Sequence, residues 1–148
     1  MEHKIESLQE LADEASAFVG QLVPQEGKAT LVTLSGELGA GKTAFTKEVA
    51  KALGVEETVT SPTFVLEKIY QLPEGKPFAR LIHIDAYRLE SGTELSPLGY
   101  DAFMQDPQNL VLLEWPEKVA DALGTPTLEI RFSVSGETTR TLSYNHGA

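Results

Sequence analysis

The sequence predicts an α/β fold in which a mixed β-sheet is flanked by helices and ends in a C-terminal β-hairpin. An apolar, β-branched run at residues 29–34 is followed by a glycine-rich loop and by a helical pattern at 43–53. Later apolar runs both pair locally and alternate with helical segments, which is typical of a sheet with parallel and antiparallel strands. The last two runs flank a short turn at 135–137 and predict the hairpin.

The first helix is predicted at residues 8–22. Ser7 and Glu10 have the spacing of a capping box, and Pro24 follows the last turn. One apolar stripe runs along this helix. Its members are Leu8, Leu11, Ala12, Ala15, Phe18, Val19 and Leu22.

The remaining elements follow in order along the chain. The helix at 43–53 ends before Gly54, a residue typical of helix C-termini. Runs rich in β-branched and aromatic residues predict two strands around a turn, and proline and glycine interrupt a stretch of short helical turns. The expected strands are 64–72, 78–84, 109–113, 127–134 and 138–144, with helical turns at 91–108 and a helix at 116–123.

Composition limits the class of protein. The chain has 148 residues, of which 41% are hydrophobic and 23% are charged, and we expect a single domain spanning 1–148. It contains no cysteine, which excludes disulfides and thiolate metal sites. Residues 1–6 lack the apolar core of a signal peptide, and no apolar run approaches the roughly 20 residues that cross a bilayer. We therefore expect a cytoplasmic protein that does not enter a membrane.

Residues 36–43 match G-x-x-x-x-G-K-[ST], the pattern of a phosphate-binding loop between a strand and a helix. Its glycines permit backbone angles that turn successive N–H groups towards an anion, and the following helix directs its positive dipole end there. Lys42 is expected to contact the β- and γ-phosphates, and Thr43 to ligate Mg²⁺. The expected nucleotide-contacting residues are Gly36, Glu37, Leu38, Gly39, Ala40, Gly41, Lys42, Thr43 and Ala44.

Two acidic residues stand directly after predicted strands. Asp85 follows the strand at 78–84, and Glu114 follows the strand at 109–113. Ligands of open α/β sheets gather at the carboxyl ends of strands, so both carboxylates could face the loop. Either acid alone could simply begin a solvated loop. Together with a phosphate-binding loop, they indicate that at least one meets the metal.

Several other residues have two interpretations each. Ser61 and Thr63 could order on a γ-phosphate, although Ser-Pro is by itself a turn signal. His83, a lone strand histidine, is expected to be packed or hydrogen-bonded rather than catalytic. Arg88 could stabilise developing charge or form an ion pair. Trp115 could stack on a base or a partner, but a place in the core or at its rim is more common.

Four ordered segments together resemble one bacterial family. They are the loop at 36–43, Ser-Pro-Thr-Phe at 61–64, His-Ile-Asp-Ala-Tyr-Arg at 83–88 and Glu-Trp-Pro-Glu-Lys at 114–118. In this order and at this spacing they resemble the ATPase subunit of tRNA threonylcarbamoyladenosine biosynthesis, the TsaE or YjeE family. The resemblance covers nearly the whole chain, including its short length and closing hairpin.

The resemblance implies a P-loop NTPase-like fold and a Mg²⁺-dependent ATPase that acts as a nucleotide-driven switch inside a complex. Transferase subunits similar to TsaD and TsaB would place the threonylcarbamoyl group on adenosine 37 of tRNAs that read ANN codons. ATP hydrolysis is expected to be slow, and weakest without these partners. By resemblance, Thr43 and Glu114 match the Mg²⁺ ligands, and Asp85 matches the acid linked to hydrolysis, where it acts beside Lys42. Further positions expected near the nucleotide are Ser61, Thr63, Glu117 and Arg140.

The sequence departs from the family pattern at two loop positions. Glu37 stands where the family usually has Asp, and Ala44 stands where a second hydroxyl is common. Neither change removes a phosphate donor or a metal ligand. The net charge of −10 argues against strong direct binding of nucleic acid, and it fits a complex in which partner subunits hold the tRNA.

Loops of this kind also occur in proteins with other functions. A GTPase is disfavoured because no N-K-x-D motif follows the loop. A small-molecule kinase would usually add an arginine-bearing lid, and the chain has only four scattered arginines. A nucleotide-sensing docking module that does not hydrolyse ATP would use the same binding residues, so it stays open as an alternative.

Overall fold

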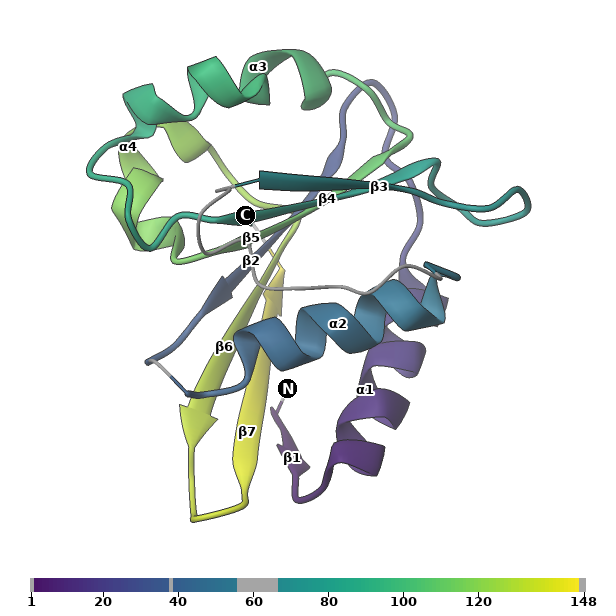
Figure 1. Cartoon of the computed structure of the whole chain (residues 1–148), viewed down its shortest axis with the longest axis vertical. Helices are drawn as coiled ribbons and strands as arrows, with labels where there is room; N and C mark the ends of the chain where they lie inside the picture. The colour runs from purple at the N-terminus through teal and green to yellow at the C-terminus, as the bar shows by residue number, and fades with distance from the viewer. Residues whose placement is uncertain (1, 38, 56–66, 147–148) are drawn as a thin grey trace.

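A computed structural model of the chain describes residues 2–37, 39–55 and 67–146. Within them, one mixed seven-stranded sheet has the order β1-β7-β6-β2-β5-β4-β3 (Figure 1). Its central strands pair in parallel, and antiparallel strands flank them on both sides. The parallel strands are β2 (Thr30–Ser35), β4 (Arg80–Asp85), β5 (Asn109–Glu114) and β6 (Leu128–Val134). The antiparallel strands are β1 (Glu2–Ile5), β3 (Glu67–Gln71) and β7 (Arg140–His146).

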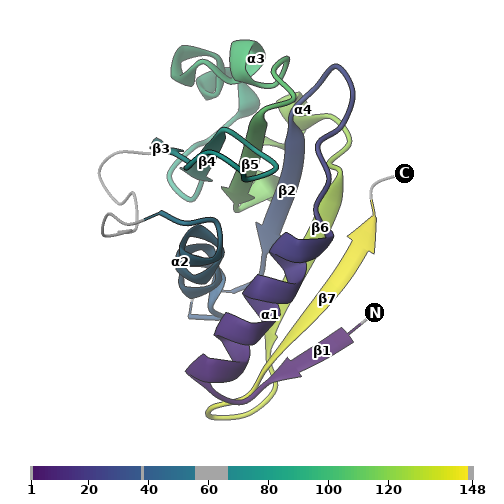
Figure 2. The same ribbon diagram turned by 90° about the vertical axis from the view of Figure 1, so that its right-hand side faces the viewer.

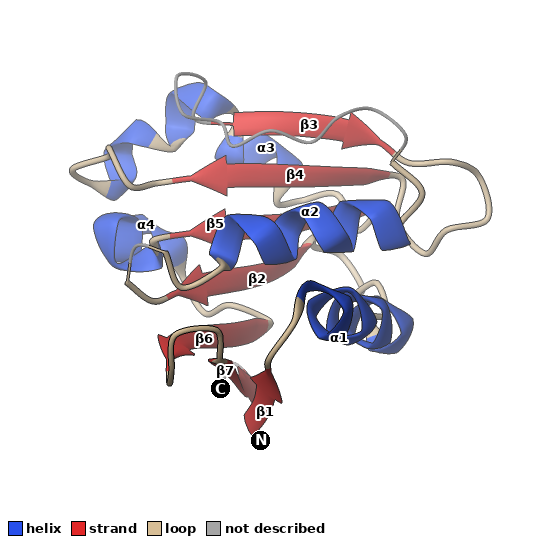
Figure 3. Cartoon of the chain, turned by 60° about the horizontal axis from the view of Figure 1, so that its bottom comes forward, coloured by secondary structure: helices blue, strands red, loops and turns tan. Residues whose placement is uncertain are grey.

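Helices cover both faces of this sheet (Figure 3). One face packs against α1 (Leu8–Gln21) and α2 (Lys42–Ala52). The opposite face packs against short elements. These are the 3₁₀ turns Gly92–Glu94, Ser96–Leu98 and Pro116–Val119, with α3 (Tyr100–Phe103) and α4 (Ala120–Leu123). The expectation of a mixed sheet flanked by helices is confirmed.

The burial of β5 explains why its sequence lacks polar alternation. Leu110 and Leu112 belong to the apolar cluster under α1 and α2, whereas Val111 and Leu113 belong to the cluster on the other face. A strand covered on both sides reads as a continuous apolar run. Its only charged side chain is Glu114, the last residue of the strand.

The first helix begins at the expected residue, but one residue of its expected apolar stripe is exposed. The Ser7 hydroxyl accepts a hydrogen bond from the Glu10 N–H at 3.1 Å and caps α1. Leu11, Ala15 and Phe18 are buried against the sheet. Leu8 was expected in the same apolar stripe, yet its side chain is 79% exposed because no element covers the first turn of the helix.

A later helix also differs from its expected extent. The expected helix at 116–123 is a 3₁₀ turn followed by a single α-helical turn, because Val119 leaves helical backbone angles between them. The part of the expected strand at 64–66 lies outside the described residues. Beyond it, β3 and β4 form the expected hairpin, and β6 and β7 form the C-terminal one.

Strand β1 was not expected from the sequence. Its four residues pair antiparallel with β7, so the first and last strands lie side by side at one edge of the sheet (Figure 2). A mixed polar run of this length carries no periodic signal, and the strand depends on its partner. No helix in the described part of the chain is long and apolar enough to cross a membrane.

Strand register brings the two acids to one edge. Asp85 at the end of β4 is paired with Glu114 at the end of β5, and Glu114 is also paired with Leu34 near the end of β2. The loop from β2 to α2 leaves the sheet at this same edge. The fold therefore places the glycine-rich loop and both carboxylates together, as the sequence predicted.

Candidate functional site

Glycines with positive φ shape the loop between β2 and α2. Gly36 has φ 142°, and a Cβ there would collide with the carbonyl oxygen of Phe132 on β6. Gly41 has φ 102° and forms the N-cap of α2. The first hydrogen bond after this cap runs from the Phe45 N–H to the Gly41 carbonyl at 2.9 Å. The three amides between them, in the first helical turn, have no intrahelical acceptor and are available to an anion.

The Lys42 side chain is folded back over the loop and is only 5% exposed. Its Nζ donates to the carbonyl oxygens of Gly36 and, at 3.0 Å, of Glu37. It also lies 4.0 Å from the centre of the Trp115 ring. Burial lowers the pKa of Lys42, while nearby carboxylates, that of Glu114 foremost, oppose this shift. The ammonium is thus desolvated and poised beside the free amides.

Thr43 and Glu114 meet across the cleft. The Thr43 hydroxyl lies 3.2 Å from each carboxylate oxygen of Glu114, although the two residues are far apart in sequence. Glu114 is nearly fully buried, and its Oε2 lies 2.5 Å from Nε2 of the buried His83. A hydroxyl and a carboxylate are the hard oxygen donors that Mg²⁺ accepts, usually together with phosphate oxygens and water. The residues present therefore fit a magnesium ion.

Asp85 stands at the same edge and is half-buried. Burial raises the pKa of its carboxyl group, and the neighbouring Glu114 raises it further. The Tyr87 N–H, which donates to Oδ1 at 3.0 Å, acts in the opposite direction, as do His83 and Lys42. Perturbed carboxyl groups of this kind occur at sites where protons are moved or water is oriented.

These side chains line one cleft of about 310 Å³. Its walls come from the loop, the start of α2 and the ends of β4 and β5, and they include two aromatic residues, Tyr87 and Trp115. The structure thus brings together four polar side chains expected from the sequence, Lys42, Thr43, Asp85 and Glu114, with four further expected residues of the loop and the start of α2. The remaining residues of the lining are Gly39, Ala40, Gly41 and Ala44.

A second cavity, of about 350 Å³, lies beside this cleft and shares four lining residues with it, three from the loop and one from the first turn of α2. Its lining is largely apolar and is formed by the start of α1 and the inner face of β6 and β7. Arg140 lies here, and its guanidinium donates to the carbonyl oxygens of Gly136 and Thr139 at 3.2 and 3.1 Å. The apolar side chains of this lining are Ile5, Leu8, Leu11, Ala40, Ala44, Phe132 and Leu142.

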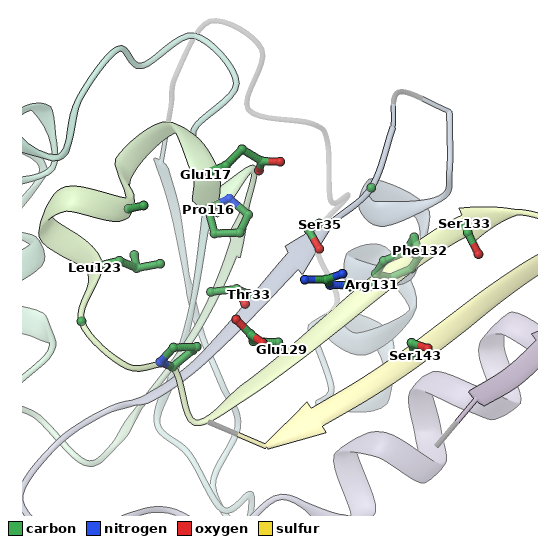
Figure 4. A pocket seen from close by; sticks show the side chains of 14 residues that line it. Thr33, Ser35, Pro116, Glu117, Leu123, Glu129, Arg131, Phe132, Ser133 and Ser143 are labelled. Carbon is green, nitrogen blue, oxygen red and sulfur yellow. The ribbon is translucent and has the colours of Figure 1, made fainter. Parts of the chain in front are cut away.

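A third pocket, of about 680 Å³, opens over β2 and β6 on the opposite face of the sheet (Figure 4). Glu117 lines this pocket and does not line the cleft at the start of α2, although its charge still acts on Lys42. Polar side chains from the strands, among them Ser35, Glu129 and Arg131, form much of its floor (Figure 4). Three expected site residues, Leu38, Ser61 and Thr63, lie outside the described residues.

Two contacts at this cleft and directly behind it were not predicted from the sequence. The sequence indicated that His83 is packed or hydrogen-bonded, but not that its partner is Glu114. It did not pair Trp115 with Lys42, although Trp115 directly follows a strand-ending acid. The only local signal was the placement of these residues next to Asp85 and Glu114, because neither contact has a spacing that a sequence pattern records.

Comparison with known proteins identifies the family. Residues 5–142 match the model of the threonylcarbamoyl adenosine biosynthesis protein TsaE. The chain belongs to the TsaE family. This membership associates it with the biosynthesis of threonylcarbamoyladenosine in tRNA, and it confirms the family that the four ordered segments indicated.

Individual TsaE relatives agree with this assignment. The chain is 43% identical over 103 residues to the TsaE protein of Streptomyces coelicolor, an alignment that covers 68% of this chain and 66% of that one. It is 35% identical over 133 residues to TsaE of Rickettsia prowazekii, covering 89% and 85% of the two chains. The crystal structure of YdiB from Bacillus subtilis superimposes with a TM-score of 0.78 and 26% identity, covering all of this chain and 86% of that one.

Proposed function

We propose that this TsaE-family protein binds ATP with Mg²⁺ in the cleft at the start of α2 and hydrolyses it slowly. In doing so it would act as a nucleotide-driven switch in the complex that threonylcarbamoylates adenosine 37 of tRNAs reading ANN codons. The observation that carries the proposal is the convergence of Lys42, Thr43, Asp85 and Glu114 on one cleft beside free helix amides. No single one of these residues would carry it.

Binding of the phosphates is supported by the loop geometry. The amides of Lys42, Thr43 and Ala44 precede the first helical hydrogen bond, and the positive end of the α2 dipole adds to them. The Lys42 ammonium is already within the cleft, where it donates to loop carbonyls. Exchange of those carbonyls for phosphate oxygens would replace neutral acceptors with charged ones, which form the stronger hydrogen bonds.

Thr43 and Glu114 are the residues that would hold the magnesium ion. Mg²⁺ bound there would neutralise charge on the phosphate oxygens. Asp85 lies across the same cleft, and its raised pKa suits a carboxylate that orients the attacking water or accepts its proton.

The adjoining apolar cavity is the proposed site of the adenine ring. It continues from the phosphate cleft through Gly39, Ala40, Gly41 and Ala44, so a nucleotide could occupy both at once. Leu8 and Phe132 would contact the faces of the base, and the exposed side chain of Leu8 would become covered. Burial of an exposed leucine contributes up to about 1.5–3 kcal/mol, a gain that requires an occupant.

A thermal-shift experiment tests nucleotide binding. ATP with Mg²⁺ should raise the melting temperature of the protein, because a ligand at 100 times its Kd stabilises the folded state by about 2.7 kcal/mol. GTP should raise it less, because the proposed base site is for adenine. Lys42→Ala should lose the effect. Lys51→Ala, in the exposed last turn of the same helix, is the matched control and should keep it. Equal protection by GTP would contradict the adenine site, and full protection of Lys42→Ala would contradict the phosphate site.

Hydrolysis and partners need separate measurements. Glu114→Ala should retain some ATP binding but lose Mg²⁺-dependent phosphate release in the presence of the transferase subunits. Phosphate that appears on an added small molecule would indicate a kinase, and binding without any turnover would indicate a docking module. A pull-down with and without ATP should recover subunits similar to TsaD and TsaB in a nucleotide-dependent manner. Their absence under both conditions would contradict the proposed complex.

A further inference from the structure

His83 lies in the interior of the protein with a polar edge turned towards the site. It is 0% exposed and sits on β4, where it is paired with Leu112 of β5. Two residues beyond that pair, β5 ends in Glu114. The side chain of His83 therefore reaches diagonally from β4 to the end of the neighbouring strand β5. Its Nε2 lies 2.5 Å from Oε2 of Glu114.

The direction of this hydrogen bond follows from the acceptor. A carboxylate oxygen accepts hydrogen bonds, so the proton of the contact is carried by Nε2 of His83. The opposite ring nitrogen, Nδ1, is buried and has no hydrogen-bond partner within the described residues. Among the described residues, Glu114 is thus the hydrogen-bond partner that defines the orientation of the His83 ring.

Glu114 is held from two sides. The Thr43 hydroxyl lies 3.2 Å from both of its carboxylate oxygens, whereas His83 contacts Oε2 alone. A carboxylate at the end of a side chain can rotate about its last bond. Occupying one lone pair of Oε2 from within the sheet fixes that rotation and leaves the other lone pairs directed towards Thr43 and the cleft.

We propose that His83 is a positioning residue for the metal site, which acts by holding the Glu114 carboxylate in the orientation that ligates Mg²⁺. This inference rests on the proposed function, in which Thr43 and Glu114 are the ligands. Residues that hydrogen-bond a metal ligand from behind typically contribute about 10–100-fold to metal affinity. A histidine that served only to fill the core would affect stability and leave the metal dependence of nucleotide binding unchanged.

The test compares two substitutions at this position. His83→Leu fills a similar volume without a donor, and His83→Gln retains an amide N–H that can reach the place of Nε2. ATP binding is measured by calorimetry in EDTA and across a Mg²⁺ titration, and Mn²⁺ binding is measured by electron paramagnetic resonance. In His83→Leu, the Mg²⁺ concentration that gives the half-maximal increase in ATP affinity should rise about 10–100-fold. The ATP affinity in EDTA should stay within about threefold of the wild-type value. His83→Gln should restore most of the metal affinity.

A packing control separates positioning from general destabilisation. Leu81 is fully buried on the same face of β4 as His83 and belongs to the core cluster under α1 and α2. Leu81→Val therefore lowers the packing stability of the same region but removes no polar contact to Glu114. This variant should keep the wild-type metal dependence. Unchanged metal dependence in a folded His83→Leu variant would overturn the inference, as would an equal change in Leu81→Val. If His83→Leu fails to fold, His83→Asn replaces it in the comparison with His83→Gln, because the shorter amide of asparagine does not reach the position of Nε2. Equal metal affinity of His83→Asn and His83→Gln would overturn the inference. If the wild-type protein binds no ATP under any of these conditions, the proposed function itself is wrong.

Discussion

The ammonium of Lys42 lies 4.0 Å above the ring of Trp115, which is the residue directly after the buried Glu114. Trp115 has φ 62°, the only positive φ of a non-glycine residue in the described part of the chain. Left-handed backbone at such a bulky residue is strained, and strain of this kind concentrates at functional sites. The sharp turn, held by a hydrogen bond from the Trp115 N–H to the Leu34 carbonyl at 3.1 Å, keeps Glu114 in the sheet while the indole reaches Lys42.

This contact predicts an optical signal of nucleotide binding. Phosphate oxygens should draw Lys42 away from the ring and remove a cation–π contact worth about 0.5–2 kcal/mol. Trp115 is the single tryptophan of the chain, so its emission reports the event directly. We expect ATP to change the emission intensity of the wild-type protein. Lys42→Ala should have altered emission without nucleotide and no response to it; a response equal to that of wild type would refute the assignment.

Asp85→Asn is expected to stabilise the nucleotide-free protein while it impairs hydrolysis. Burial, reinforced by Glu114, disfavours the ionised form of Asp85 in the folded state. An amide of the same shape has no charge to desolvate and can still accept the hydrogen bond from Tyr87. The melting temperature at pH 7 should therefore rise; in a protein of this size each ~1 kcal/mol of added stability raises it by about 2–4 °C.

The pH dependence of that difference gives a sharper test. Because the folded-state pKa of Asp85 is raised above its ordinary value of 3.8, the stability it contributes is fully present below that value and declines as the pH rises through the folded pKa. The advantage of Asp85→Asn should therefore be small in acid and complete at neutral pH. Unfolding in urea across this range measures it, and an advantage that is the same at both ends would show that charge is not its cause.

Glycine in the loop is predicted to be required for two separate reasons. A side chain at Gly36 meets the backbone of Phe132 as well as an unfavourable φ, whereas Gly39 has φ 80° and open space around its would-be Cβ. Gly39→Ala should cost about 1–2 kcal/mol of stability, the penalty of left-handed backbone. Gly36→Ala should cost more and should also weaken ATP binding, because β6 cannot move away. Denaturant unfolding compares the two; equal losses would contradict the close approach to β6.

A remote hydrogen-bond cluster is predicted to affect stability alone. The Tyr144 hydroxyl donates to Glu14 at 2.6 Å, and His3 of β1 contacts the same carboxylate, so α1, β1 and β7 are joined there. Tyr144→Phe should lower the free energy of unfolding by about 1.5–3 kcal/mol, the range for hydrogen bonds to charged groups. ATP affinity, measured on the same preparation by calorimetry, should stay unchanged, since none of these residues lines the cleft.

Much of the fold was predictable because its signals are local. A β-branched run, a glycine-rich loop and a helical stripe lie within 25 residues around Lys42, and each has its own periodicity or backbone requirement. The positions of Asp85 and Glu114 after apolar strands were sufficient to expect both at one edge of the sheet. Strand β1 escaped prediction because its few polar residues become a strand only by pairing with β7.

By itself, the sequence determined the family and the glycine-rich loop and indicated the residues that could serve it, because these depend on residue type and short spacing. The tertiary structure alone decided which of them touch. His83 reaches Glu114, Trp115 lies under Lys42, Arg140 lines the apolar cavity beside the cleft, and Glu117 lies in a different pocket. These contacts follow from strand order and register, which are set by packing summed over both faces of the sheet and are recorded at no single position of the chain.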